Sequence, residues 1–219
     1  MKPIQNADGH VGLTARDYPI AAATVITMGQ VVKLSGGKVV AAGSAETGPI
    51  LGISGENHSA QPDVLNTRSN GEALLVCDNP GLLFECHAPT VKAGSGSATT
   101  MAAASGEIAS AIADDAFNGG VLVLVKKAAG SGNTDPLGAR IPVTDYAKSG
   151  TTFTKPSGGT PGAGDEYELY PPVGSAVCGL DAAAQNLVVS ATGATSIRVV
   201  GHDFARHMLR CMAALHTLN

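Results

Sequence analysis

The chain has 219 residues and a net charge of −4, and only 4% of its residues are aromatic and 15% charged. Binding of nucleic acid needs a basic surface or aromatic stacking platforms, so this composition argues against it. No stretch reaches the ~20 apolar residues of a membrane span, and residues 1–20 contain no apolar segment of signal-peptide length. We therefore expect a protein that binds neither nucleic acid nor membrane and that is made in the cytoplasm.

Small and turn-forming residues dominate the sequence. Glycine and proline supply 28 and 12 residues, and tryptophan is absent. This composition is typical of an all-β structural protein. Residues 1–24 mix polar residues with glycine and proline and have little periodicity, so we expect an extended N-terminal arm.

The first candidate chemical feature is "VVKLSGGKVV", in which Gly36, Gly37 and Lys38 separate two valine-rich runs. A phosphate-binding loop needs another glycine five positions before Gly37 and a Ser or Thr after Lys38, and the sequence has Val at both positions. Two glycines between strand-like runs are typical of a β-hairpin turn. We predict a hairpin with an exposed lysine and no phosphate site.

Short apolar runs follow at fairly even spacing. They are "GPILGIS", "ALLVC", "LLFEC" and "VLVLV", which begin at residues 48, 73, 82 and 121. Such runs predict a β-sandwich or barrel, and we place this main β domain at residues 25–130. The Asp-Asn-Pro-Gly cluster at 78–81 predicts a turn. Residues 92–120 stay ambiguous, because their alanine content favours a helix and their glycines interrupt it.

The character of the sequence changes near residue 130. Residues 131–165 are rich in glycine, proline, serine and threonine, which predicts loops or linkers with short strands at "ARIPVTDY" and "TTFTK". Strand-like runs return in residues 166–219, for which we predict a smaller C-terminal β module. Within it, residues 203–218 fit two alternatives: their apolar spacing matches a helix, and the all-β context favours a strand paired with "SIRVV".

One candidate hydrolase group is formed by Ser54, Glu56 and His58, which lie close together in the sequence. The stretch "GISGE" begins like a nucleophile elbow but has Glu56 where the last glycine is needed. Neighbours on a loop seldom have the geometry of a catalytic triad. We expect these residues to belong to a solvated loop.

The four cysteines are Cys77, Cys86, Cys178 and Cys211. Cys77 and Cys86 with His87 suggest a zinc site, but the close cysteine pairs of structural zinc modules are missing. We expect free, mostly buried thiols.

Four further candidates for metal ligands lie near the C-terminus: His202, Asp203, His207 and His216. His207 and His216 are nine residues apart, which places them on opposite sides of either a strand or a helix. A metal site is therefore disfavoured.

Acidic residues also gather in two places: Asp114 with Asp115, and Asp165 with Glu166 and Glu168. Their spacing matches no calcium loop, and we expect them to solvate loops. The sequence thus offers no catalytic, cofactor-binding or metal-binding residue, and we expect that the protein is not an enzyme.

Residues 29–34, 38–42 and 49–53 form the phrase "GQVVKL…KVVAA…PILGI", which is followed by "ALLVC" and "LLFEC". This order of strands and turns resembles capsid decoration, or cement, proteins of tailed bacteriophages. The segments "DDAFNGGVLVLVKK" and "GDEYELYPPVGS" are also similar to segments of phage virion proteins. The resemblance covers most of the chain as a pattern and includes no reactive residue.

The resemblance implies a virion structural protein that stabilises the outside of a capsid by bridging major capsid subunits. It further implies a small oligomer, which we expect to be a homotrimer, on the capsid exterior and without a cofactor. Another phage structural component fits the same pattern: a head fibre base, or a tail or baseplate protein with a host- or glycan-binding surface.

Overall fold

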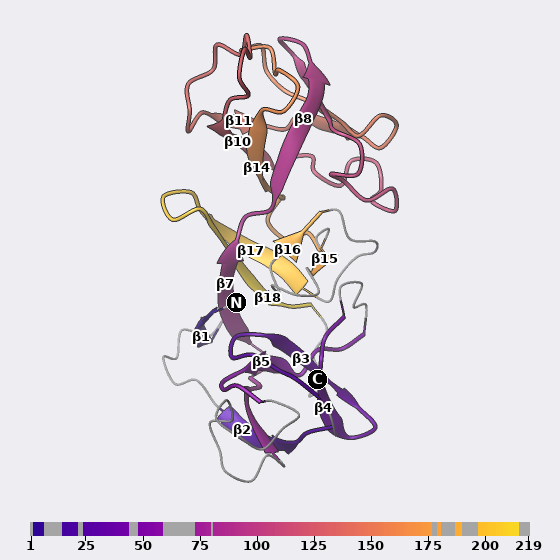
Figure 1. The fold of residues 1–219 in the computed structure, drawn as a ribbon, viewed down its shortest axis with the longest axis vertical. Coiled ribbons are helices and arrows are strands. Elements are labelled where there is room, and N and C mark those ends of the chain that lie inside the picture. Colours follow the sequence, from indigo (N-terminus) through magenta and orange to yellow (C-terminus); the bar gives the residue numbers. More distant parts are fainter. Residues whose placement is uncertain are drawn as a thin grey trace.

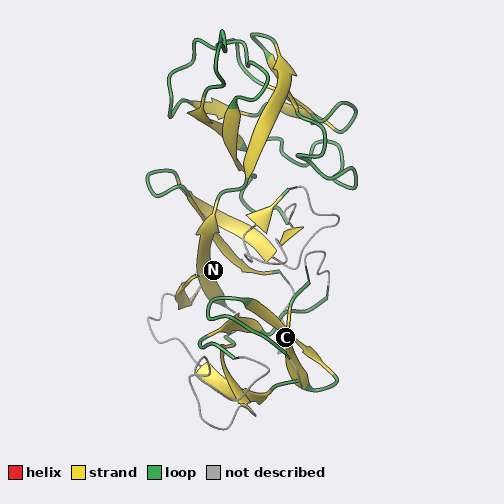
Figure 2. Ribbon diagram, viewed as in Figure 1, coloured by secondary structure: helices red, strands yellow, loops and turns green. Residues whose placement is uncertain are grey.

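The computed structural model describes residues 2–6, 15–21, 24–43, 48–58, 73–79, 81–176, 179–180, 187–189 and 197–214. These residues form strands, turns and loops (Figure 2), which confirms the predicted mainly β fold. They contain no helix long and apolar enough to cross a membrane. The chain is elongated, and three β units follow one another along its long axis (Figure 1). We call them the lower barrel, the middle sheet and the upper barrel.

The lower barrel is a five-stranded antiparallel sheet with the strand order β2-β6-β5-β3-β4. Its strands are β2 (Ala15–Pro19), β3 (Val31–Ser35), β4 (Lys38–Ala41), β5 (Gly52–Ser54) and β6 (Ala73–Cys77). The two edges meet, because Ile20 bridges Val39 and the Ala21 amide donates to the Val39 carbonyl at 3.1 Å. The interior is filled by Ile20, Ile26, Val32, Val39, Leu51, Leu74 and Val76.

The predicted "SGG" hairpin is confirmed in the lower barrel. β3 and β4 pair in antiparallel register from Val32↔Ala41 to Ser35↔Lys38. Gly36 and Gly37 form the turn with φ angles of 57° and 77°, which only glycine adopts readily at two successive positions. Lys38 is exposed, as predicted.

The middle sheet has the strand order β1-β7-β18-β17 and is built from both ends of the chain. Its strands are β1 (Lys2–Asn6), β7 (Leu82–His87), β17 (Ile197–Asp203) and β18 (Met208–Ala213). A separate short pair, β15 (Gly179–Leu180) with β16 (Leu187–Val188), lies beside it (Figure 1). The open alternative for residues 203–218 is settled as far as residue 214: residues 204–207 form a turn, and β18 is a strand that pairs with both β17 and β7.

The upper barrel contains seven strands in the order β11-β10-β14-β8-β9-β13-β12. They are β8 (Thr90–Gly96), β9 (Thr100–Ala103), β10 (Val121–Lys126), β11 (Arg140–Pro142), β12 (Asp145–Ala147), β13 (Thr152–Thr154) and β14 (Glu166–Tyr170). The end strands β11 and β12 follow one another in the chain and are linked by residues 143 and 144, which bring the two edges of the sheet together at that point. Phe117, Tyr146 and Phe153 fill its centre, with ring centroids 4.8–5.6 Å apart.

The ambiguous alanine-rich segment forms turns over residues 104–120 and no helix. Gly106 takes a φ of 82°, which is not helical. The Ala109 amide donates to the Val189 carbonyl at 2.8 Å, so it is not used in a local helical hydrogen bond. Ile108 and Ile112 are both buried, so this segment packs its apolar side chains into the core.

The three units do not coincide with the predicted domain boundaries. β10 pairs with β14 from Val121↔Tyr170 to Lys126↔Glu166, so one barrel spans the expected boundary at residue 130. Within the predicted N-terminal arm, the described residues 2–6 and 15–19 are strands: β1 belongs to the middle sheet and β2 to the lower barrel. Of the turn predicted at 78–81, residues 78, 79 and 81 are described; they lie between β6 and β7, and the Gly81 amide donates to Asn79 Oδ1 at 2.8 Å. Patterns in the sequence predict pairing between strands that are close in the chain, whereas the pairings of β1, β2 and β14 are with strands far away in the chain.

Gly52 provides a test of how closely β5 and β6 pack. A Cβ atom at this position would lie 2.0 Å from the Cys77 carbonyl oxygen, whereas one at Gly43 would meet nothing within 4 Å. We expect Gly52→Ala to lower the free energy of unfolding by about 3 kcal/mol or more, because backbone must move to admit the methyl group. Gly43→Ala is the matched control and should change it by less than about 0.5 kcal/mol. Equal urea midpoints for the two variants would contradict this packing.

Candidate functional site

Ser54, Glu56 and His58 are buried in the lower barrel and do not form the solvated loop that we expected. The Ser54 hydroxyl donates to the Glu56 carbonyl at 2.6 Å, and Glu56 Oε1 accepts from the Leu75 amide at 2.6 Å. The His58 ring binds the Thr24 carbonyl through Nδ1 at 2.9 Å. The three side chains therefore brace backbone segments, and this geometry has no base oriented toward the serine.

The candidate zinc ligands lie in different units. Cys77 belongs to β6 of the lower barrel and Cys86 to β7 of the middle sheet, while His87 is exposed. The three described cysteines are buried thiols outside any disulfide, as predicted, whereas Cys178 lies outside the described residues. Within those residues no group of three His, Cys, Asp or Glu side chains is arranged to hold a metal ion.

His202 and His207 contribute to the joint between the middle sheet and the upper barrel. His207 Nδ1 lies 2.9 Å from Glu168 Oε2, which also accepts from the Tyr170 hydroxyl at 2.9 Å. His202 Nε2 lies 2.7 Å from the Pro171 carbonyl oxygen. The predicted ligand His216 lies outside the described residues.

The turn at residues 204–207, which includes His207, also makes aromatic and backbone contacts across the joint. The Phe204 ring lies 4.5 Å from the Tyr170 ring, and the Arg140 guanidinium stands 4.4 Å above Phe204. The carbonyl of His207 accepts from the Ala88 amide at 3.1 Å, where the chain enters the upper barrel. His207 has a φ of 58°, a left-handed conformation that is unusual for a residue with a side chain. One turn, residues 204–207, thus fixes the upper barrel to the middle sheet.

A buried carboxylate anchors this turn to β7. Glu85 is 3% exposed, and both of its oxygens accept from Arg206, at 2.7 and 2.6 Å. Asp203 lies 3.7 Å from the Arg206 guanidinium and 3.9 Å from that of Arg210. A bidentate guanidinium–carboxylate pair fixes direction as well as distance, so it orients the turn.

The loops of the upper barrel are held by Asp165, which we had expected to solvate a loop. It is fully buried and accepts hydrogen bonds of 2.8–3.0 Å from the Ala128 and Gly162 amides and from the Ser131 and Asn133 side chains. Burial alone would raise the pKa of Asp165, but these hydrogen bonds outweigh it and hold the pKa below its usual value. The predicted linkers are therefore fixed at this point.

Lys155 ties a second loop to the same barrel. It is 3% exposed, and its ammonium donates to the Ala98 carbonyl at 2.8 Å and to the Gly159 carbonyl at 2.9 Å. Burial lowers the pKa of Lys155, and the nearby Asp135 carboxylate opposes this effect. The Gly159 amide donates to Asp135 Oδ1 at 2.7 Å, which joins the two loops.

A hollow of about 210 Å³ opens between these loops. Its polar lining is Asp135, Arg140, Lys155 and Ser157, and Pro142 and Pro156 supply apolar walls. This combination of a carboxylate, two cations and a hydroxyl could hold a small polar ligand. We call the loops of residues 127–142 and 155–165, with this hollow, the loop crown.

The remaining acidic residues have local roles. Asp114 and Asp115 are exposed, and they accept from the Lys148 amide at 2.6 Å and from the Asn118 side chain at 2.8 Å. Glu166 forms a 2.8 Å ion pair with Lys126. Asp114 and Asp115 lie in a turn, in agreement with the loop role expected for them, whereas Glu166 is the first residue of β14.

Sequence reasoning missed Glu85, Asp165 and Lys155 as anchors. The only signal was indirect: Glu85 stands in the apolar run "LLFEC", where a lone charge predicts a buried partner. That partner, Arg206, is 121 residues away, and no local pattern identifies it.

Comparison with models of known protein families, with curated protein sequences and with solved structures finds no match for this chain. The site residues are therefore interpreted from their geometry alone.

The Asp165 network predicts a pH-dependent stability. We expect Asp165→Asn to lower the free energy of unfolding at pH 7 by about 2–3 kcal/mol, because the amide presents a donor to groups that need an acceptor. Since the folded pKa of Asp165 is depressed, its contribution is present above the unfolded value of about 3.9 and is lost as pH falls through the folded one. Urea unfolding at pH 7 and at stepwise lower pH measures both effects.

Glu166→Gln is the matched control, since it removes the neighbouring carboxylate from an exposed pair. It should lower the free energy of unfolding by at most about 1 kcal/mol. A gap between wild type and Asp165→Asn that stays constant below pH 4 would contradict the role given to Asp165.

Proposed function

We propose that this chain is a virion structural protein that decorates and cements the outside of a tailed-phage capsid by bridging major capsid subunits. The observation that carries the proposal is the row of three β units in one elongated chain, with the joint between the middle sheet and the upper barrel fixed by hydrogen bonds (Figure 1). Such a body would reach from one subunit to the next, and its fixed upper joint would transmit load between the middle sheet and the upper barrel.

The physical requirements of a cement protein fit these features. Several weak contacts made by one rigid body add up on a lattice, because the second contact becomes intramolecular once the first has formed. Rigidity keeps that gain, since little conformational freedom is lost on binding. The buried anchors Glu85, Asp165 and Lys155 supply this rigidity at the joint and in the loop crown.

A structural role also suits the use made of reactive residue types. Ser54, His58 and Glu56 brace the lower barrel, and His202 and His207 hold the joint. We propose that the protein is not an enzyme and needs no cofactor. Its partners would be the major capsid protein and further copies of itself in a homotrimer, on the capsid exterior and without contact to nucleic acid or membrane.

Co-sedimentation tests the proposed role. We expect the purified chain at micromolar concentration to pellet with expanded shells of the major capsid protein encoded in the same genome, and to leave isolated capsid monomers unbound. Multivalent contact on the shell is the physical reason for the difference. Binding to neither, or equally to both, would contradict lattice cementing.

Exposed apolar side chains at the two ends provide matched variants for the same assay. Val25 and Met28 are both 64% exposed on the lower barrel, and Leu137 is 62% exposed in the loop crown. Val25→Asp with Met28→Asp and, separately, Leu137→Asp report which end faces the shell. Unchanged pelleting of both variants would show that these side chains make no shell contact.

A second candidate is another phage structural component, such as a head fibre base or a tail or baseplate protein with a host- or glycan-binding surface. The hollow in the loop crown favours it, because Asp135, Lys155 and Ser157 offer the donors and acceptors that hydroxyl groups require. The number of copies in each virion separates the two candidates. Cement is spread over the whole shell, whereas a fibre or baseplate protein is confined to one vertex or to the tail.

A further inference from the structure

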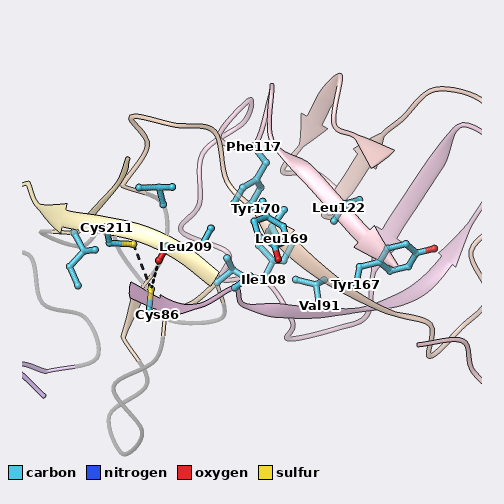
Figure 3. Close-up of a cluster of buried hydrophobic side chains, with 14 of the residues drawn as sticks. Cys86, Val91, Ile108, Phe117, Leu122, Tyr167, Leu169, Tyr170, Leu209 and Cys211 are labelled. Atoms are coloured by element: carbon cyan, nitrogen blue, oxygen red, sulfur yellow. Dashed lines mark hydrogen bonds between the residues drawn. The ribbon is translucent and has the colours of Figure 1, made fainter. Parts of the chain in front are cut away.

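Two of the buried cysteines touch each other across the middle sheet. Cys86 on β7 and Cys211 on β18 place their sulfur atoms 3.6 Å apart (Figure 3). We propose that these two thiols are a redox cross-link site, at which oxidation forms a Cys86–Cys211 disulfide within the folded chain. The inference goes beyond the proposed function, because it concerns the isolated protein in any setting.

The strand register explains why the two sulfur atoms meet. Cys86 lies opposite Leu209 and Cys211 opposite Phe84, so the cysteines are diagonal neighbours on one face of an antiparallel pair. Diagonal neighbours lie farther apart than directly opposed residues, and the 3.6 Å separation shows that these two short side chains nevertheless reach each other. A disulfide needs a sulfur–sulfur distance of about 2.05 Å, and the sulfur atoms are already in van der Waals contact, so side-chain rotation with a small strand adjustment closes the gap.

The surroundings favour this pair over the other described cysteine. Cys86 and Cys211 are 2% and 0% exposed, which keeps large oxidants out and leaves each thiol beside its partner. Cys77 belongs to β6 of the lower barrel, whereas the sulfur atoms of Cys86 and Cys211 lie 3.6 Å apart in the middle sheet, so proximity selects this pair.

Hydrogen peroxide, a small oxidant, can accept the two electrons that disulfide formation releases. The thiolate of one cysteine attacks hydrogen peroxide, the O–O bond breaks, and a sulfenic acid and hydroxide form. The thiolate of the second cysteine then attacks that sulfur atom, the S–O bond breaks, and the disulfide forms as hydroxide leaves. The two thiol protons convert the two hydroxides to water, so two thiols and one peroxide give one disulfide and two waters.

The cross-link would join one strand that precedes the upper barrel in the sequence to one that follows it. Cys86 and Cys211 are 125 positions apart, and residues 90–170 between them form the whole barrel. A disulfide that closes such a long loop restricts the unfolded chain strongly. Oxidation should therefore raise the melting temperature by at least about 5 °C.

The test uses the full-length chain, freed of reductant and treated with hydrogen peroxide. We expect the count of free thiols, taken after denaturation, to fall from four to two, and peptide mapping to find Cys86 linked to Cys211 in the monomer. Cys77→Ser is the matched control and should still form the link. Cys211→Ser should not form it, and should leave a sulfenic acid at Cys86 that dimedone labels when the oxidised chain is unfolded in its presence.

Three results would overturn the proposal. One is a wild-type chain that keeps four thiols under conditions that fully oxidise the denatured chain. Another is a disulfide that contains Cys77 or Cys178, or that joins two chains. The third is a Cys86–Cys211 link that leaves the melting temperature unchanged or lower. The wild-type mapping decides the matter even if a serine variant fails to fold.

Discussion

The antiparallel pairing of β7 with β18 is the constraint on which the rest of the structure depends. It brings together distant residues such as Cys86 and Leu209, which are 123 positions apart in the chain. β7 continues through Ala88 into the upper barrel, and the chain that leaves that barrel returns as β17 and β18. The strand that leads into the upper barrel and the strands that follow it in the chain therefore belong to one sheet. The cluster of buried apolar side chains runs without a break from this sheet into the upper barrel (Figure 3).

Buried polar side chains fix the turns and loops that surround the apolar core. Glu85 holds the β17–β18 turn through Arg206, and the same turn holds the upper barrel through His207 and Glu168. Asp165 orders the loops of the crown. An unpartnered buried charge is strongly destabilising, so each of these groups tolerates only a narrow set of loop positions. A long chain with few aromatic residues gains rigidity in this way without a large core at each loop.

The sequence predicted those features whose causes are local. The "SGG" hairpin was found because its turn residues stand between the strands that they join, and the mainly β class followed from short apolar runs. The domain boundaries differed because β10 pairs with β14 across the glycine- and proline-rich segment. The roles of Asp165, Glu85 and Lys155 were missed because their partners are distant in sequence or are backbone groups, which no spacing rule reveals.

The proposed decoration role would place the protein on the outside of a phage capsid, and its position in a virion tests that proposal most directly. A reconstruction of virions from the source of this sequence measures it. We expect density for an elongated body of three β units, repeated over the outer surface of the shell and in contact with neighbouring capsid subunits. Density confined to a vertex or to the tail, or a virion without this chain, would contradict that role.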